Sequence, residues 1–209
     1  MCGNVIIPYP FRIGGDCSVN QWYIIDCNSS KPYLSAFGQL EVLDVNTMNQ
    51  TVTVNAPTIS ACQNSIWNIS QAMSIDLGRS PFMFSKSHNK FVFEGCGNAV
   101  MMDPGCKVLT GCSTKCNTDT LSQRKSCFGI SCCQSTITYY LKSYNINITR
   151  LARDERACRS AFLVDEASYV EGRFSKDYNS YVPLSLLWTL SERDILNVSC
   201  YYSAGTIEF

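Results

Sequence analysis

The sequence reads GCGNAVMMDPGCKVLTGCSTKC from Gly95 to Cys116 and, after a polar insert, SCFGISCCQS from Ser126 to Ser135. These two stretches hold seven of the thirteen cysteines of the chain. Cysteines this close in sequence leave no room between them for a helix or a strand of normal length. We therefore expect a turn-rich knot closed by disulfide bonds, with extended or β-rich chain around it.

The cysteine count also indicates the compartment of the protein. Thirteen cysteines in 209 residues suggest metal sites in a cytosolic protein and disulfide bonds in a secreted one. The zinc alternative lacks ligands, because His88 is the single histidine and no pair of CxxC motifs is present. Five sequences of the N-glycosylation type favour secretion, and their acceptor residues are Asn28, Asn49, Asn68, Asn147 and Asn197. We expect a secreted, glycosylated, disulfide-bonded chain with no metal ion and no cofactor.

An odd number of cysteines leaves at least one of them without a partner in this chain. We expect Cys2 to be that residue, with its partner upstream of the sequence. The adjacent Cys132 and Cys133 are expected to bond elsewhere and so to anchor two strands through one turn. The pairing itself cannot be read from sequence. The cysteines expected in disulfides are Cys17, Cys27, Cys62, Cys96, Cys106, Cys112, Cys116, Cys127, Cys132, Cys133, Cys158 and Cys200.

Alternating apolar residues predict two β-hairpins. The first joins Leu40–Val45 to Thr51–Val54 across a turn rich in Asn and Thr. The second joins Phe82–Phe84 to Phe91–Phe93 across the polar tip Ser85–Lys90. The four phenylalanines of this second hairpin stand at alternate positions, so they are expected to face one core.

Further β-structure is expected on both sides of the knot. The segment NVIIPYPFRI (Asn4–Ile13) contains two prolines, which exclude a helix or a central strand and predict an edge or an ordered aromatic loop. Other strand candidates are Trp22–Cys27, Ser135–Tyr144, Ile146–Leu151, Ala161–Val164 and Val182–Leu190. The predicted fold is mostly β, a disulfide-rich extracellular module of short antiparallel strands and hairpins with few short helices. A weak boundary near residue 105 divides it into residues 1–105 and 106–209.

Several motifs resemble one plant family, in the same order along nearly the whole chain. The opening CGNVIIPYPF (Cys2–Phe11) is similar to the start of the galacturonan-binding ectodomain of wall-associated kinases. Arg12 departs from that pattern, because the family usually has glycine at this place. The further matches are NKFVFEGC (Asn89–Cys96), GCSTKC (Gly111–Cys116), GISCCQ (Gly129–Gln134), Cys158 with AFLVD (Ala161–Asp165), and Val182–Trp188.

The resemblance implies the wall-facing ectodomain of a plant receptor-like kinase. Residues 1–105 would be a galacturonan-binding half, and residues 106–209 a cysteine-rich half of the wall-associated-kinase type. Pectin or oligogalacturonides would be the ligand, at the extracellular face of the plasma membrane. With no signal peptide in residues 1–15 and no run of about 18 apolar residues, we expect an extracellular portion of a longer protein. Membrane anchoring and kinase catalysis would then belong to missing segments, and this portion would be non-catalytic.

The net charge of zero is unevenly distributed, at −3 in residues 1–78, +7 in residues 79–159 and −4 in residues 160–209. Such a field can attract a polyanion or orient a partner, unless the folded chain mixes these charges on its surface. Polygalacturonate is a row of carboxylates, so its receptor needs basic side chains, preferably arginine. The alternative is a protein-recognition ectodomain that senses a peptide, a pathogen protein or a co-receptor without binding carbohydrate. Nucleic acid is not expected as a partner.

The candidate ligand-binding residues are all basic. One group lies on the predicted hairpin tip, one in the insert of the knot, and one recurs at every third position from residue 150. Arg12 adjoins Tyr9 and Phe11, which could instead form a packed aromatic plug beside a disulfide. For each single site, solvated charge is the alternative. The candidates are Arg12, Lys86, His88, Lys90, Arg124, Lys125, Arg150, Arg153, Arg156 and Arg159.

Overall fold

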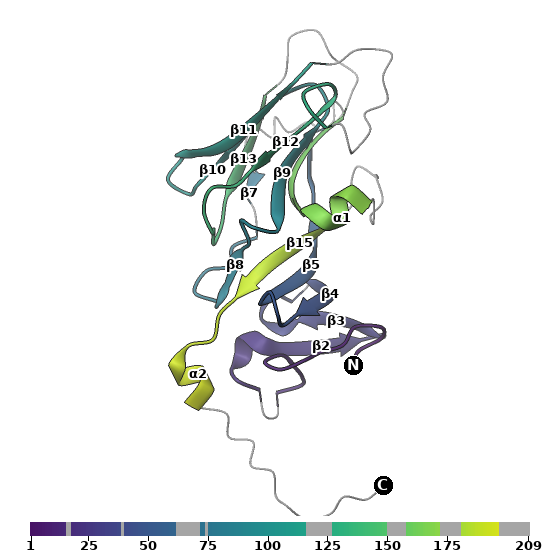
Figure 1. Cartoon of the computed structure of the whole chain (residues 1–209), viewed down its shortest axis with the longest axis vertical. Coiled ribbons are helices and arrows are strands. Elements are labelled where there is room, and N and C mark those ends of the chain that lie inside the picture. Colours follow the sequence, from purple (N-terminus) through teal and green to yellow (C-terminus); the bar gives the residue numbers. More distant parts are fainter. Residues whose placement is uncertain are drawn as a thin grey trace, which may run out of the picture.

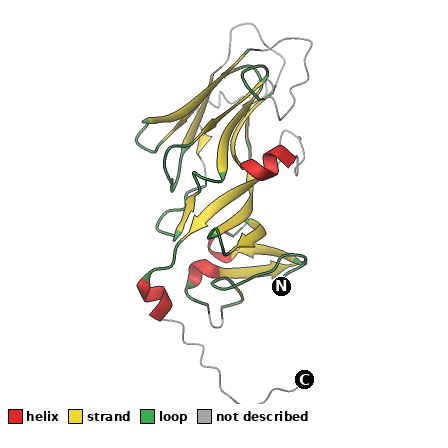
Figure 2. Cartoon of the chain, viewed as in Figure 1, coloured by secondary structure: helices red, strands yellow, loops and turns green. Residues whose placement is uncertain are grey.

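The computed structural model describes residues 1–15, 18–38, 40–61, 72–73, 75–115, 127–149, 158–171 and 181–196. Strands dominate these residues (Figure 2), which confirms the predicted mostly β fold class. The described helices are short. They are the 3-10 turns η1 (Gln21–Tyr23) and η2 (Ser35–Phe37) and the α-helices α1 (Glu166–Glu171) and α2 (Glu192–Leu196).

The strands form three sheets, in which every neighbouring pair is antiparallel except β1 with β2. The seven-stranded sheet has the order β1 (Arg12–Ile13), β2 (Ile24–Asn28), β3 (Lys31–Leu34), β4 (Glu41–Asn46), β5 (Thr51–Pro57), β15 (Tyr181–Trp188), β8 (Phe82–Phe84). The second sheet has the order β11 (Val108–Thr114), β10 (Gly97–Met102), β13 (Asn145–Thr149), β7 (Ala72–Met73). The third has the order β12 (Cys132–Thr136), β9 (Asn89–Glu94), β14 (Arg159–Asp165), β6 (Ile59–Ala61). Figure 1 shows β2 to β5 in the lower half of the molecule and the two four-stranded sheets in the upper half.

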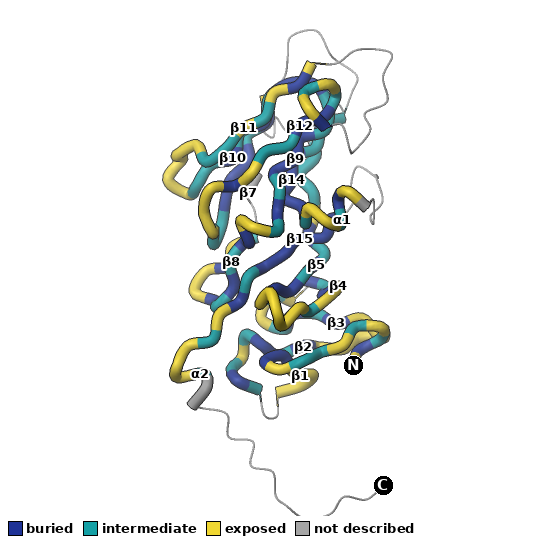
Figure 3. The backbone as a smooth tube through the Cα atoms, in the orientation of Figure 1, coloured by how far each residue is buried: buried dark blue, intermediate teal, exposed yellow. Residues whose placement is uncertain are grey.

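The strand predictions are confirmed where the apolar pattern was strongest. The first predicted hairpin is β4 paired with β5. The buried strand expected at Ala161–Val164 is β14, and the run Val182–Leu190 forms most of β15. β15 is buried along most of its length (Figure 3), because it lies between β5 and β8 and also contacts β14. In contrast, the β-rich run expected at Ser135–Tyr144 ends as a strand at Thr136.

The second predicted hairpin is wrong as a pair of strands but right about its core. Phe82, Phe84, Phe91 and Phe93 are all fully buried in one hydrophobic cluster. However, β8 pairs with β15, whereas β9 pairs with β12 and β14. The two arms of the expected hairpin therefore belong to different sheets.

Asn89, the first residue of β9, explains this division. Its side chain is 1% exposed, and its amide group donates to the backbone carbonyls of Ser85 and Ser185, at 2.7 Å each. The Asn89 side-chain oxygen accepts from the Ser185 backbone N–H at 2.9 Å. The turn after β8 is thus bonded to the middle of β15, and the chain leaves it in the direction of the third sheet.

The PYPF segment forms the suggested aromatic plug only through Phe11, because Tyr9 is exposed. Phe11 is 3% exposed and its ring lies 5.3 Å from Tyr23, 6.1 Å from Phe82 and 5.9 Å from Trp188, measured between ring centroids. Phe11 precedes β1 and Phe82 lies on β8, the two outer strands of the seven-stranded sheet. Their contact shows that the sheet curls until its two edges share one aromatic core.

The cysteine-rich segment contains more regular structure than expected. β10, β11 and β12 all lie within residues 96–136, and β11 has seven residues. The expectation that no strand fits there is wrong, because strands form between the cysteines. Only the Cys127–Cys132 disulfide of the two described in this segment closes a short loop, at a sequence separation of 5. Cys112 of β11 is bonded to Cys133 of β12, and Cys132 is bonded to Cys127. The adjacent cysteines therefore have separate partners, as predicted.

The expected orphan cysteine is also wrong. Cys2 is bonded to Cys27 of β2, because the N-terminal residues form a tight turn beside that strand, with reciprocal backbone hydrogen bonds of 3.0 Å between Cys2 and Val5. Cys106, which was expected in a disulfide, is a free and exposed cysteine in the turn between β10 and β11. Cys96 and Cys158 are disulfide-bonded. The predictions for Cys17, Cys62, Cys116 and Cys200 lie outside the described residues.

The division of the chain at residue 105 stays a prediction. The turn between β10 and β11 lies at that position, and β15 from the C-terminal part joins the sheet built by β1 to β5.

Thiol labelling tests the cysteine assignment. A maleimide reagent applied to the folded, unreduced protein should modify Cys106, because its sulfur is exposed and unbonded. Peptide mass spectrometry should find Cys2 and Cys27 unmodified and linked. Labelled Cys2 together with unlabelled Cys106 would contradict the assignment.

Substitution of Asn89 tests the junction between the sheets. Asn89→Ala removes three side-chain hydrogen bonds, among them the one that the Ser185 N–H of β15 donates, so it should lower the free energy of unfolding by about 3 kcal/mol. Chemical denaturation of the oxidised protein measures this. The control Asn4→Ala, at an exposed turn, should change the value by less than about 0.5 kcal/mol. Equal effects of the two variants would contradict the role of Asn89.

Candidate functional site

Among the described basic candidates, Arg12 has the side chain best placed to contact a ligand. It lies on β1, at the edge of the seven-stranded sheet, where its side chain is exposed and makes no ion pair with any described residue. The backbone before it is held by the buried Phe11, so the guanidinium group projects from a fixed strand.

A pocket of about 390 Å³ surrounds Arg12. Tyr9, which is 57% exposed, lines it together with apolar residues of the N-terminal segment. The complete lining is Met1, Ile7, Tyr9, Pro10, Phe11, Arg12 and Ile13. One cation beside an accessible phenol ring suits a ligand that carries both a carboxylate and an apolar face.

The basic residues of the turn after β8 do not act as one cationic group. The Lys86 amine lies 5.2 Å from the ring centroid of Tyr140, whereas Lys90 forms an ion pair of 3.4 Å with Glu166. His88 is half-buried, with Nδ1 2.9 Å from the Ser85 hydroxyl. It lines a hollow of about 390 Å³ together with Asp44 and Asp165, whose charge disfavours a polyanion. Lys86 is therefore the accessible cation of this turn.

Arg159 is a buried structural residue, not a surface charge. It is 2% exposed, and its Nε donates to the backbone carbonyl of Cys96 at 2.6 Å. Gly95 makes this approach possible, because it has a φ of +122° and a Cβ there would lie 2.9 Å from the Cγ of Arg159. The candidates Arg124, Lys125, Arg150, Arg153 and Arg156 lie outside the described residues.

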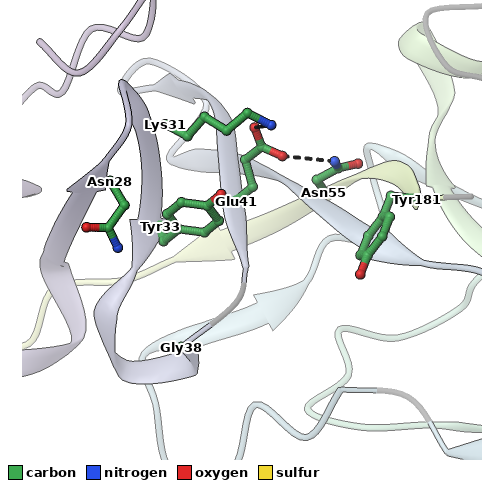
Figure 4. A pocket seen from close by; sticks show the side chains of 7 residues that line it. All are labelled: Asn28, Lys31, Tyr33, Gly38, Glu41, Asn55 and Tyr181. Atoms are coloured by element: carbon green, nitrogen blue, oxygen red, sulfur yellow. Dashed lines mark hydrogen bonds and ion pairs between the residues drawn. The ribbon is translucent and has the colours of Figure 1, made fainter.

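A larger pocket, of about 550 Å³, lies on the face of the seven-stranded sheet that points away from the core (Figure 4). The Glu41 carboxylate is at its centre, 3.1 Å from the Lys31 amine, and accepts a hydrogen bond of 3.2 Å from the Asn55 side chain. The hydrogen bond that Lys31 donates to Glu41, together with the negative charge of Glu41, raises the pKa of Lys31. Tyr33 and Tyr181 flank this polar row.

This pocket was not predicted from sequence. Its residues come from five strands or their ends, and they share a face only through the register that places Tyr33 opposite Glu41 and Glu41 opposite Asn55. The alternation of β4 and β5 was a usable signal for the last two residues. No local pattern indicated that Tyr181 would lie beside them.

The sequons differ in their exposure. Asn28 and Asn49 are exposed at the β2–β3 and β4–β5 turns, and both line pockets. Asn147 is half-buried on β13, and its side-chain oxygen is buried without a hydrogen-bond partner. Asn68 and Asn197 lie outside the described residues.

The described part of the chain contains neither a cluster of metal-ligating side chains nor a helix that could cross a membrane. No group of three or more His, Cys, Asp or Glu side chains is gathered there around a common point. None of the helices there is both long enough and apolar enough to cross a membrane.

Comparison with known proteins links the chain to one family. Residues 1–56 match the sequence model described as wall-associated receptor kinase galacturonan-binding. The chain is 29% identical to wall-associated receptor kinase-like 6 of Arabidopsis thaliana over 189 residues, which are 79% of this chain and 29% of that protein. It is 30% identical to wall-associated receptor kinase-like 1 of the same plant over 217 residues, or 90% of this chain and 29% of that protein. No solved structure matches the chain.

The chain thus spans less than a third of the length of these relatives. Within that span the matches cover most of its residues, and the predicted resemblance is confirmed. The chain is related to the wall-associated receptor kinase-like proteins, and it opens with a segment of their galacturonan-binding type.

Proposed function

We propose that this chain is the extracellular, ligand-binding portion of a plant cell-wall receptor and that it binds de-esterified oligogalacturonides through Arg12. The observation that carries the proposal is the pocket around Arg12 and Tyr9, because all its lining residues belong to the segment that matches the galacturonan-binding model. The binding portion itself is non-catalytic in this proposal, and it faces the cell wall.

Arg12 has the chemistry that an acidic sugar needs. A guanidinium group donates two parallel hydrogen bonds to one carboxylate, and charge-assisted bonds of this kind are the stronger ones. No carboxylate of the described residues competes for Arg12 through an ion pair. The exposed ring of Tyr9 offers a flat surface on which the apolar face of a sugar ring packs.

Lys86 is a second basic position for the same polyanion. The Lys86 amine and the exposed Tyr140 ring pair a cation with an aromatic surface, as Arg12 and Tyr9 do. However, Lys86 contacts its own aromatic neighbour as a cation–π pair, and it does not line any of the three pockets described above. We therefore assign the principal contact to Arg12.

Binding of a defined oligosaccharide tests the assignment. Arg12→Ala should weaken the affinity of the secreted protein for decagalacturonate by about tenfold or more, because it removes a bidentate, charge-assisted contact. Arg12→Lys should retain part of the affinity, because it keeps the charge but loses the bidentate geometry. Titration calorimetry at low and at moderate salt measures both, and the affinity should fall as salt rises.

The matched control is Arg79→Ala, which removes an exposed arginine from a turn of the same protein. It should leave the affinity within about twofold of the unsubstituted protein. Methyl-esterified decagalacturonate, which lacks the carboxylates, should not bind. Salt-insensitive binding of a protein partner, with no binding of de-esterified oligogalacturonide, would replace this proposal with the protein-recognition alternative.

A further inference from the structure

We propose that the first sugars of an N-glycan on Asn28 pack into the sheet-face pocket between Tyr33 and Tyr181. Asn28 is an exposed acceptor in the sequence Asn28-Ser29-Ser30, and its own side chain lines that pocket. In Figure 4 Asn28 stands at one end of the row, beside the ring of Tyr33. This inference is independent of galacturonan binding, because it concerns another pocket and an uncharged sugar.

The attachment point is held rigidly. Asn28 ends β2 beside Cys27, which is bonded to Cys2. Gly3 lies against the turn after Asn28 so closely that a Cβ on it would be 2.1 Å from the Ser30 carbonyl oxygen. A glycan that starts from a fixed point loses less conformational freedom when its first rings pack on the protein.

The charge balance of the pocket favours an uncharged sugar. Lys31 is its one cation and is paired with Glu41, so the lining side chains sum to zero charge. A galacturonate carboxylate would meet Glu41 without an unpaired cation to offset the repulsion. N-acetylglucosamine, with which an N-glycan begins, carries no charge and offers hydroxyl and amide groups to the side chains of Asn55 and Lys31.

The size and the walls of the pocket fit an oligosaccharide. Its volume is about 550 Å³, and its residues extend from β2 across β3, β4 and β5 to β15. Four strand spacings correspond to about 19 Å, which exceeds the length of a single sugar ring. Tyr181 is 51% exposed at the far end, so its ring is free to cover the apolar face of a sugar.

The modification itself needs only the secretory pathway. The Nδ2 atom of Asn28 bonds to C1 of the first N-acetylglucosamine of a lipid-pyrophosphate-linked oligosaccharide, the pyrophosphate carrier leaves, and the amide nitrogen loses one proton. Asn49 is a second exposed acceptor, and the hollow that it lines contains no tyrosine. The two sites therefore provide an internal comparison.

The test uses the chain secreted from a eukaryotic host that adds mannose-rich glycans. Mass spectrometry of the glycopeptides should find Asn28 occupied. An endoglycosidase that cuts between the first two sugars should release the Asn28 glycan from the folded protein about tenfold more slowly than the Asn49 glycan. After reduction and denaturation, the two rates should be equal.

Variants connect the protection to the pocket. Tyr181→Ala should raise the release rate at Asn28 to that at Asn49, whereas Tyr181→Phe, which keeps the ring, should preserve the protection. Tyr139→Ala, at an exposed tyrosine that does not line this pocket, should change neither rate, and thermal unfolding of each variant shows that it is folded.

Three results would overturn the proposal. They are an unoccupied Asn28, equal release rates in the folded protein, and protection that survives Tyr181→Ala. An unoccupied Asn28 together with binding of free N,N′-diacetylchitobiose would assign the pocket to an external saccharide instead.

Discussion

The buried side-chain amide of Asn89 links two of the three sheets. Asn89 bonds to the turn at Ser85 and to the backbone of Ser185 in the middle of β15. The Ser185 hydroxyl in turn donates to the carboxylate of Asp165 on β14, at 2.8 Å. The seven-stranded sheet and the third sheet therefore meet through a continuous polar connection in a largely apolar interior. Every atom of the Asn89 amide that can form a hydrogen bond is used there, which is why a single polar side chain is stable at this depth.

The local patterns of the sequence predicted which side chains face the core. They did not predict which distant strands pair with each other. Alternation identified the core-facing phenylalanines around residues 82–93 and the hairpin of β4 and β5, because both depend only on period-two geometry. It could not reveal that β8 and β9 have other partners, since their paired residues in β15 and β14 lie 66 to 106 positions further along the chain. The cysteine spacing misled in the same way. The disulfide between Cys112 and Cys133 joins edge strands of two different sheets, and sequence distance between cysteines says little about which strands lie side by side.

The candidate sites differ in the same respect, because some depend on residues close in sequence and others on strand pairing. Arg12 and Tyr9 are close in sequence, so their shared pocket was within reach of a motif-based argument. The row of Lys31, Glu41 and Asn55 was not, because it needs the register of three strands. Arg159 looked like a surface charge among other charged residues, yet the absence of a side chain at Gly95 lets it approach the backbone at Cys96 and lie buried. Burial of this kind depends on a tertiary contact that composition does not report.

The position of β15 has a consequence for the order of folding. Residues 181–188 fill the gap between β5 and β8, and Trp188 contributes to the same aromatic core as Phe11. A chain that emerges from the ribosome from its N-terminus exposes the edge of β5 until more than a hundred further residues have been made. Unpaired strand edges invite association with other chains, and contacts between distant residues form slowly. The segment that matches the family model is therefore completed as a sheet only after β15, more than a hundred residues downstream of β5, has been made.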